Sequence, residues 1–175
     1  LRVSVRQLQR AFEERGSACT VLVFIDDATS RILRLHFAET ETTASYFEAM
    51  HSYLRQHGKP LAFYSDRAAV FRAPVANRHG PTQFQRALDE LDIDLICANS
   101  PQAKGRVERA NRTLQDRLVK ALRLDGISTI KAANAWTDSF LAIHNRRFAR
   151  SPRSSLDRVS RLLAGATTGD PPRRR

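Results

Sequence analysis

Alternating apolar and polar residues predict a β-hairpin in the first quarter of the chain. Residues 20–26 (TVLVFID) form an apolar run rich in β-branched side chains. Residues 31–37 (RILRLHF) alternate apolar and polar side chains with the period of a strand. Because the turn-forming residues 27–30 (DATS) lie between these two runs, we expect the two strands to pair as a hairpin.

Helical and strand-like periods alternate along the rest of the chain. Helices are predicted over residues 42–58, 81–91, 103–124 and 129–147, and strands over 61–65 and 93–98, while 67–80 has no clear period and predicts a loop. The side chains expected to be buried are Phe47, Met50 and Leu54 in the first helix, Phe84, Leu88 and Leu91 in the second, Val107, Ala110, Leu114, Leu118 and Leu122 in the third, and Ala133, Trp136, Phe140 and Ile143 in the fourth.

Length and composition favour one globular domain followed by a basic tail. At 175 residues, with 42% hydrophobic and 27% charged side chains, the chain is long enough for one core and too short for two full-sized domains. We expect this domain over residues 1–150, and a largely disordered tail over 151–175, which is rich in Pro, Ser and Arg. We expect neither a membrane span nor a secretory signal, because no apolar run in the sequence suits either one. Cys19 and Cys97 do not form a metal-type pair and predict buried thiols in a reducing cytoplasm.

The excess of positive charge lies in two segments towards the C-terminus. The chain has 29 Lys and Arg against 18 Asp and Glu, a net charge of +11. Residues 1–99 are neutral overall, whereas residues 100–123 carry +5 and residues 146–175 carry +7. Each segment alone would also suit a solvated helix face. Together they are typical of a surface that binds a polyanion, which favours nucleic acid as the partner.

Two acidic residues occupy positions that suit a shared divalent cation. Asp66 directly follows the predicted strand 61–65, and ligands bind at the carboxyl ends of parallel strands. Glu108 lies near the start of the helix predicted over 103–124 and has arginines on both sides, so an ion pair within the helix would explain Glu108 alone. As a pair, the two carboxylates match the preference of Mg²⁺ for one or two carboxylates together with phosphate oxygens and water.

Three segments resemble the integrase-core DDE transposases of bacterial insertion sequences, which are related to retroviral integrases. The sequence NSPQAKGRVERANRTLQDRL at 99–118 resembles their glutamate-bearing helix. LVFIDDATSRIL at 22–33 resembles their second and third strands, and LAFYSDRAAVF at 61–71 resembles the strand that carries their second aspartate. The resemblance extends over residues 11–165. It implies a ribonuclease-H-like α/β fold, a mixed sheet with antiparallel first strands and parallel later strands flanked by helices.

The resemblance also implies a reaction and a set of site residues. In such enzymes two aspartates and a glutamate bind two Mg²⁺ or Mn²⁺ ions, and the reaction is nicking of DNA followed by attack of a 3′-hydroxyl on a phosphodiester. By the motif match, Asp66 is the second acid and Glu108 the third, each a catalytic residue and metal ligand. The residues implied to contact DNA are Asn99, Ser100, Pro101, Gln102 and Lys104, with Lys104 on a phosphate, together with Arg106, Arg109 and Arg112 of the basic helix.

The chain departs from the family pattern at the first aspartate. Counting back from AFEERG at 11–16 puts that position at Val5, and residues 1–12 contain no Asp or Glu. Asp26 and Asp27 match the turn after the second strand, where such residues cap the turn. The first strand, VSVRQLQR, is also unlike the expected strand in composition. We therefore expect weakened metal binding and little or no strand transfer, as in a truncated, frameshifted or decayed transposase.

Three interpretations follow from these observations. One is a metal-dependent transposase core. The alternative is a catalytically inactive remnant with the same fold that binds DNA through residues 100–123 and 146–175, and a poorly folded remnant is a third case. We expect DNA as the partner, a homo-oligomer on DNA, no membrane, and a location with the nucleoid in a bacterial cytoplasm. Since no helix-turn-helix region precedes the core in this sequence, sequence-specific binding of element ends is not expected.

Overall fold

The computed structural model describes residues 2–9, 12, 15–26, 28–65, 80–97 and 101–151, and for residues 2–9, 97 and 101–111 we describe the backbone alone. The elements in these ranges are β1 (Arg2–Gln9), β2 (Thr20–Asp26), β3 (Ile32–Ala38), α1 (Thr43–His57), β4 (Ala62–Ser65), α2 (Gln83–Glu90), β5 (Asp94–Cys97), α3 (Pro101–Leu124) and α4 (Ile130–Phe148). Within this part of the chain, no helix is long and apolar enough to cross a membrane. The loop expected at 67–80, apart from Gly80, and the tail expected after Ser151 lie outside the described residues.

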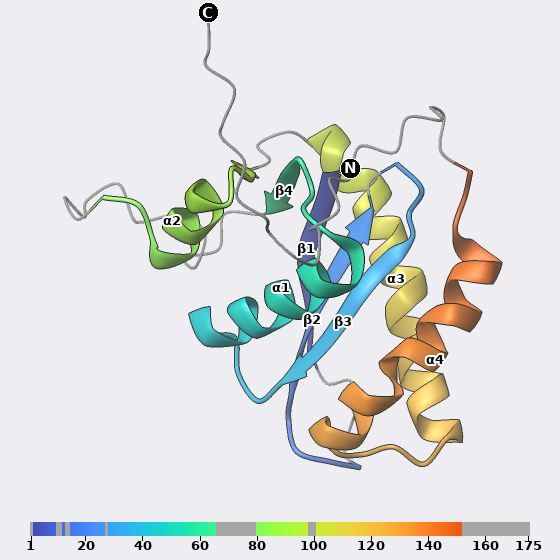
Figure 1. Cartoon of the computed structure of the whole chain (residues 1–175). Helices are drawn as coiled ribbons and strands as arrows, with labels where there is room; N and C mark the ends of the chain where they lie inside the picture. Colours follow the sequence, from blue (N-terminus) through green and yellow to red (C-terminus); the bar gives the residue numbers. More distant parts are fainter. Residues whose placement is uncertain are drawn as a thin grey trace, which may run out of the picture.

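The strands form one mixed sheet in the order β3-β2-β1-β4-β5. The first three strands are antiparallel neighbours, whereas β1, β4 and β5 run parallel to one another. Parallel strands need crossover connections: α1 lies in the connection that leads from β3 to β4, and α2 connects the parallel neighbours β4 and β5. The expected fold class, with antiparallel first strands and parallel later ones flanked by helices, is therefore confirmed (Figure 1).

Strand β1 forms at the centre of the sheet despite its unusual composition. It pairs with β2 over seven residues, from Val3 opposite Asp26 to Gln9 opposite Thr20. On its other side, Arg2, Val3 and Ser4 pair with the first three residues of β4. Pairing with a neighbour on each side thus holds β1 in the sheet, although its composition differs from that of the strand the resemblance implies.

Helices cover both faces of the sheet and create two apolar clusters. Strand β2 contributes to both: Val21, Val23 and Ile25 pack with α3 and α4, whereas Leu22 and Phe24 pack with α1 and α2. All seven residues of β2 are buried, as expected for a strand covered on both faces. Figure 1 shows α1 in front of the strands and α3 behind them, with α4 running beside β3. The molecule therefore has three layers, with β2 in the middle of its core.

Most of the described side chains that were predicted to be buried are buried, and the clear exception lies on α4. Phe47, Leu91 and Trp136 are partly buried, and the side chains of Val107 and Ala110 lie outside the described part of the chain. Ile143 is 70% exposed, so the prediction for this residue is wrong. The buried stripe of α4 instead continues from Phe140 through Leu141 to His144. An imidazole has an apolar body and a polar edge, so His144 fills this core position where hydropathy alone favours the neighbouring isoleucine. Helix α3 also begins two residues earlier than predicted, at Pro101, because proline suits the first position of a helix.

Candidate functional site

Strands β1 and β4 bring two of the predicted site positions to the same level of the sheet. Ser4 is paired with Tyr64, so one step further along the parallel strands places Val5 in line with Ser65, the last residue of β4. Neighbouring strands lie about 4.8 Å apart. The position predicted for the first acid is thus adjacent to the strand end that directly precedes Asp66, which itself lies outside the described residues.

The third predicted acid is on the helix that follows the next strand. β5 pairs in parallel with β4, and Cys97 lies opposite Ser65 at the end of both strands. Helix α3 then begins at Pro101, and Glu108 lies about 10 Å further along its axis. The topology therefore gathers the elements that carry the predicted residues at the carboxyl ends of β4 and β5, where α/β sheets bind ligands.

The predicted residues differ in how far the structure describes them. Asp66, Asn99 and Ser100 lie outside the described residues. The backbone alone is described for Pro101, Gln102, Lys104, Arg106, Glu108 and Arg109, all of which belong to α3. Arg112 is exposed on the same helix, where its guanidinium is accessible to an external anion. The metal-ligand and DNA-contact roles of these residues stay predictions.

Asp26 caps a turn, as the sequence predicts. Its carboxylate accepts hydrogen bonds from the backbone N–H of Ala28 at 3.1 Å and from the hydroxyl of Thr29 at 2.6 Å. Asp26 is buried, and it faces Val3 on β1 rather than Val5. Both oxygens of this carboxylate are thus used by the β2–β3 turn. Asp27 lies outside the described residues.

Three histidines have pKa values shifted by their surroundings. Burial lowers the pKa of His36, His57 and His144 below the ordinary value, and nearby arginines lower it further. Across the described ranges, no three His, Cys, Asp or Glu side chains group together in a way that could hold a metal ion.

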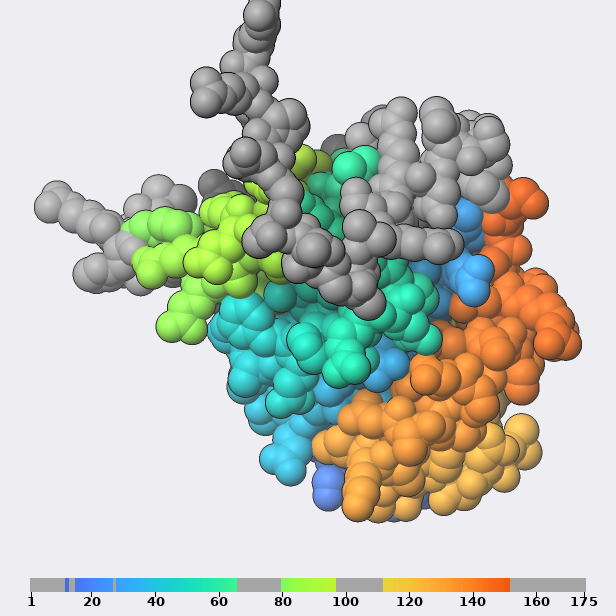
Figure 2. All heavy atoms as spheres, viewed as in Figure 1, coloured from blue at the N-terminus to red at the C-terminus, as the bar shows by residue number. Residues whose placement is uncertain are grey.

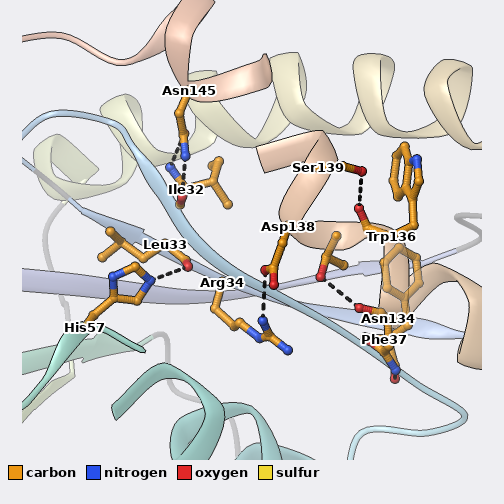
Figure 3. A network of polar contacts seen from close by, with 11 residues as sticks. Ile32, Leu33, Arg34, Phe37, His57, Asn134, Trp136, Asp138, Ser139 and Asn145 are labelled. Carbon is orange, nitrogen blue, oxygen red and sulfur yellow. Dashed lines mark hydrogen bonds and ion pairs between the residues drawn. The ribbon is translucent and has the colours of Figure 1, made fainter. Parts of the chain in front are cut away.

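A polar network that the sequence analysis missed joins α4 to the edge strand β3. The side chain of Asn134 accepts from the backbone N–H of Phe37 at 2.8 Å and donates to its carbonyl at 2.9 Å. Asn145 makes the same pair of hydrogen bonds to Ile32, at 2.9 and 2.8 Å. Figure 3 shows both amides directed at the strand. They occupy the hydrogen-bonding groups that an edge strand otherwise offers to another chain.

Between these two asparagines, charged side chains meet at the same edge. Arg34 of β3 donates to Asp138 of α4 at 3.2 Å, and His57 of α1 contacts the carbonyl oxygen of Leu33 at 2.8 Å (Figure 3). A polar cavity of about 420 Å³ opens between α1 and α4, lined by Arg34, His51, Ser52, Arg55, Gln56 and Asp138. Asn134, Asp138 and Asn145 share one helix face, and this spacing of polar residues is the signal that could have indicated the network.

Comparison of sequences relates the chain to transposases. No model of a known protein family matches it. It is 53% identical over 151 residues to y4bF of Sinorhizobium fredii, which is named as a transposase, and the match covers 85% of this chain and 33% of the relative. It is 36% identical over 137 residues to the transposase for insertion sequence IS1202 of Streptococcus pneumoniae, covering 75% of this chain and 30% of the relative. The chain thus spans about one third of the length of these relatives.

Comparison of structures relates the fold to retroviral integrases. The simian T-cell lymphotropic virus intasome, solved with the regulatory subunit B56 gamma of PP2A, aligns with a TM-score of 0.64 and 16% identity over 96% of this chain and 60% of the other. The HTLV-2 integrase catalytic core domain in complex with magnesium aligns with a TM-score of 0.58 and 18% identity, over 78% and 82% of the two chains. By sequence the chain is therefore a relative of the transposases of bacterial insertion sequences, matching one segment of them, and it has the ribonuclease-H-like fold of integrase catalytic cores.

Proposed function

We propose that this chain is a catalytic core for DNA transposition whose metal-dependent chemistry is impaired at Val5. The observation that carries the proposal is the strand register. Residue 5 lies level with the end of β4, next to the position of the second predicted acid, and its side chain has no ligand atom. The relatives named as transposases support DNA as the substrate.

The remaining acids are chemically suited to a divalent metal. Asp66 and Glu108 offer the oxygen ligands that Mg²⁺ or Mn²⁺ prefers, and a single ion needs only one or two carboxylates in addition to phosphate oxygens and water. When bound, the metal would polarise the phosphodiester and favour deprotonation of the attacking hydroxyl. The HTLV-2 core, which has the same fold, was solved in complex with magnesium. Since Val5 supplies no third carboxylate, we expect weaker binding than in a complete triad.

The chain's own residues would position the DNA. Lys104, one turn into α3, would bind a phosphate, and Asn99, Ser100 and Gln102 would contact the DNA strand that reacts. Arg106, Arg109 and Arg112 would hold the neighbouring backbone. In strand transfer, the 3′-hydroxyl oxygen bonds to phosphorus as the bond to the leaving 3′-oxygen breaks, and the proton passes to that oxygen through solvent.

Restoring the missing carboxylate tests the proposal. The wild-type chain and the Val5→Asp and Val5→Asn variants would be assayed for nicking and strand transfer on a labelled duplex with Mg²⁺ or Mn²⁺. We expect activity in Val5→Asp and little or none in the other two chains, since asparagine matches aspartate in shape but not in charge. Asp66→Asn in the Val5→Asp chain should abolish the gained activity. Binding of Mn²⁺, followed by its paramagnetic signal, should tighten in Val5→Asp independently of turnover.

Two results would contradict this assignment. Robust nicking by the wild-type chain that disappears in Asp66→Ala would show that Val5 does not impair the site. Absence of activity in Val5→Asp, with intact folding and DNA binding, would favour the second candidate function, a DNA-binding protein without chemistry. The specific observation behind that candidate is the same valine in the central strand.

We also propose that the chain self-associates on DNA and acts at the nucleoid of a bacterial cell. The HTLV-2 integrase core was solved in both trimeric and dimeric forms, which supports self-association. Light scattering after size-exclusion chromatography, with and without a DNA duplex, measures the mass directly. A monomer under both conditions would exclude the oligomer, and diffuse fluorescence of a tagged chain in cells would exclude the location.

A further inference from the structure

Two arginines from different helices gather around one aromatic ring at the end of α4. The guanidinium carbon of Arg117, on α3, lies 6.0 Å from the centre of the Phe148 ring, and that of Arg147 lies 5.6 Å from it. We call these three residues the Phe148 cluster. Cation–π attraction to the shared ring offsets part of the repulsion between the two guanidinium groups, so both are held on one surface. The two basic segments of the sequence thus meet here.

The cluster keeps a net positive charge because the nearby carboxylate of Asp116 is shared between Arg117 and Lys120. Asp116 lies 3.7 Å from the Nε of Arg117, but its other oxygen accepts a 2.6 Å hydrogen bond from Lys120. That hydrogen bond lowers the pKa of Asp116, so the carboxylate stays ionised and paired with Lys120. Residues 139–150 contain no Asp or Glu.

Two further arginines lie near the end of α4, and the chain there is anchored to the sheet. Arg146 and Arg150 are both exposed, and Arg117 has 48% of its side chain exposed. The backbone N–H of Arg150 donates to the carbonyl of Thr29 in the β2–β3 turn at 2.9 Å, which fixes the chain just beyond α4. In the space-filling view, α4 forms much of the orange-red surface on the right side of the molecule (Figure 2). The arginines near the end of α4 are therefore carried by a backbone that is fixed by the helix and by this hydrogen bond.

We propose that the Phe148 cluster, together with Arg146 and Arg150, binds the phosphodiester backbone of DNA at a surface additional to the predicted contacts on the first turns of α3. The choice of DNA rests on the proposed function. Guanidinium groups pair with phosphate oxygens in bidentate geometry, and four arginines, three of them in a segment (139–150) that contains no Asp or Glu, suit a ligand with regularly repeated negative charges. Because Phe148 already restricts Arg117 and Arg147, these side chains lose less freedom on binding.

The dependence of DNA affinity on salt tests the assignment without any metal. Each phosphate neutralised on duplex DNA contributes about 0.9 to the slope of log affinity against log salt concentration. We therefore expect Arg117→Gln/Arg147→Gln to reduce the slope by about 1.8 if each arginine contacts one phosphate. Arg117→Lys/Arg147→Lys should keep the wild-type slope, because the charge is retained while the planar group is lost.

A matched control removes the same charge elsewhere. Arg55 on α1 and Arg86 on α2 are exposed on helices that pack against the opposite face of the sheet. Arg55→Gln/Arg86→Gln should leave the slope close to the wild-type value. Arg146→Gln/Arg150→Gln serves as a second test pair at fully surface positions, and circular dichroism verifies that each variant folds.

The outcomes separate this inference from the proposed function. An unchanged slope in both glutamine pairs of the cluster surface, or an equal loss in the control pair, would overturn the inference while DNA binding itself stands. A wild-type chain without salt-dependent affinity for DNA would overturn both. Absence of metal-dependent chemistry in Val5→Asp, with the expected change of slope, would contradict the proposed catalysis and leave the DNA surface in place.

Discussion

At the scale of single residues, Asn145 should contribute more to stability than a single hydrogen bond does, because both the oxygen and the nitrogen of its amide are hydrogen-bonded. It accepts from the N–H of Ile32 and donates to the carbonyl of the same residue. A hydrogen bond contributes about 1 kcal/mol net, so Asn145→Ala should lower the free energy of unfolding by about 2 kcal/mol. Urea denaturation measures this change. Ser139→Ala is the control: Ser139 is exposed and bonds only within its own helix, so a loss as large there would show that the effect is not specific to the edge contact.

His144 gives the chain a dependence of stability on pH. It is buried between the rings of Phe140 and Phe148, and burial, together with the charge of Arg117, lowers its pKa. The unfolded chain therefore takes up a proton more readily than the folded one. Stability is fully present above the ordinary histidine pKa of about 6.5 and falls as pH decreases through the lowered value.

We therefore expect His144→Gln to lose less of its unfolding free energy than the wild type when pH is lowered from 7.5 to 5. Urea denaturation at the two pH values measures the difference. Some pH dependence should persist, because the pKa values of His36 and His57 are also lowered. The same substitution at the exposed His51 should leave the wild-type difference unchanged, and parallel behaviour of the two variants would contradict the role of His144.

At the scale of elements, Gly16 allows two connections to pass close together. It precedes β2, and a Cβ atom at this position would overlap the carbonyl oxygen of Ser128, in the connection between α3 and α4. Gly16→Ala must displace backbone, and we expect a loss of about 3 kcal/mol in thermal or urea unfolding. Gly126→Ala is a matched control in the same connection. It has a positive φ of 66° but no atom near the added carbon, so its loss should be about 1 kcal/mol. Equal losses would contradict the close approach.

At the scale of the whole molecule, the two apolar clusters share β2 and should unfold together. Leu118 lies in the cluster with α3 and α4, and Leu88 in the cluster on the other face. Leu118→Ala and Leu88→Ala should each cost about 2–5 kcal/mol. The chain has a single tryptophan, Trp136, which packs against the first cluster. Its fluorescence and the far-UV circular dichroism should give the same midpoint even in Leu88→Ala, and separate midpoints would show independent layers.

Much of this architecture follows from local pattern, whereas the contacts that depend on distant backbone do not. The run 20–26 and the helix 42–58 carry their own periodicity, and Asp26 is a turn cap by its position after a strand. By contrast, the partners of Asn145 lie more than a hundred residues away, so no local signal specifies them. The same distinction applies to the candidate site. The local sequence predicts that a strand ends just before Asp66, whereas the position of Val5 beside that strand end follows only from the register between β1 and β4.

The two asparagine amides of α4 also require the spacing along the helix to match the spacing along strand β3. Asn134 and Asn145 are eleven residues apart, about 16 Å along a helix, and their partners Phe37 and Ile32 are five residues apart, about 17 Å along a strand. One residue inserted between the two asparagines would turn the second amide by about 100° and leave its strand partner unpaired. Changes of chain length should therefore be excluded from this stretch of α4 among descendants of this sequence that still fold, even where its exposed positions accept many substitutions.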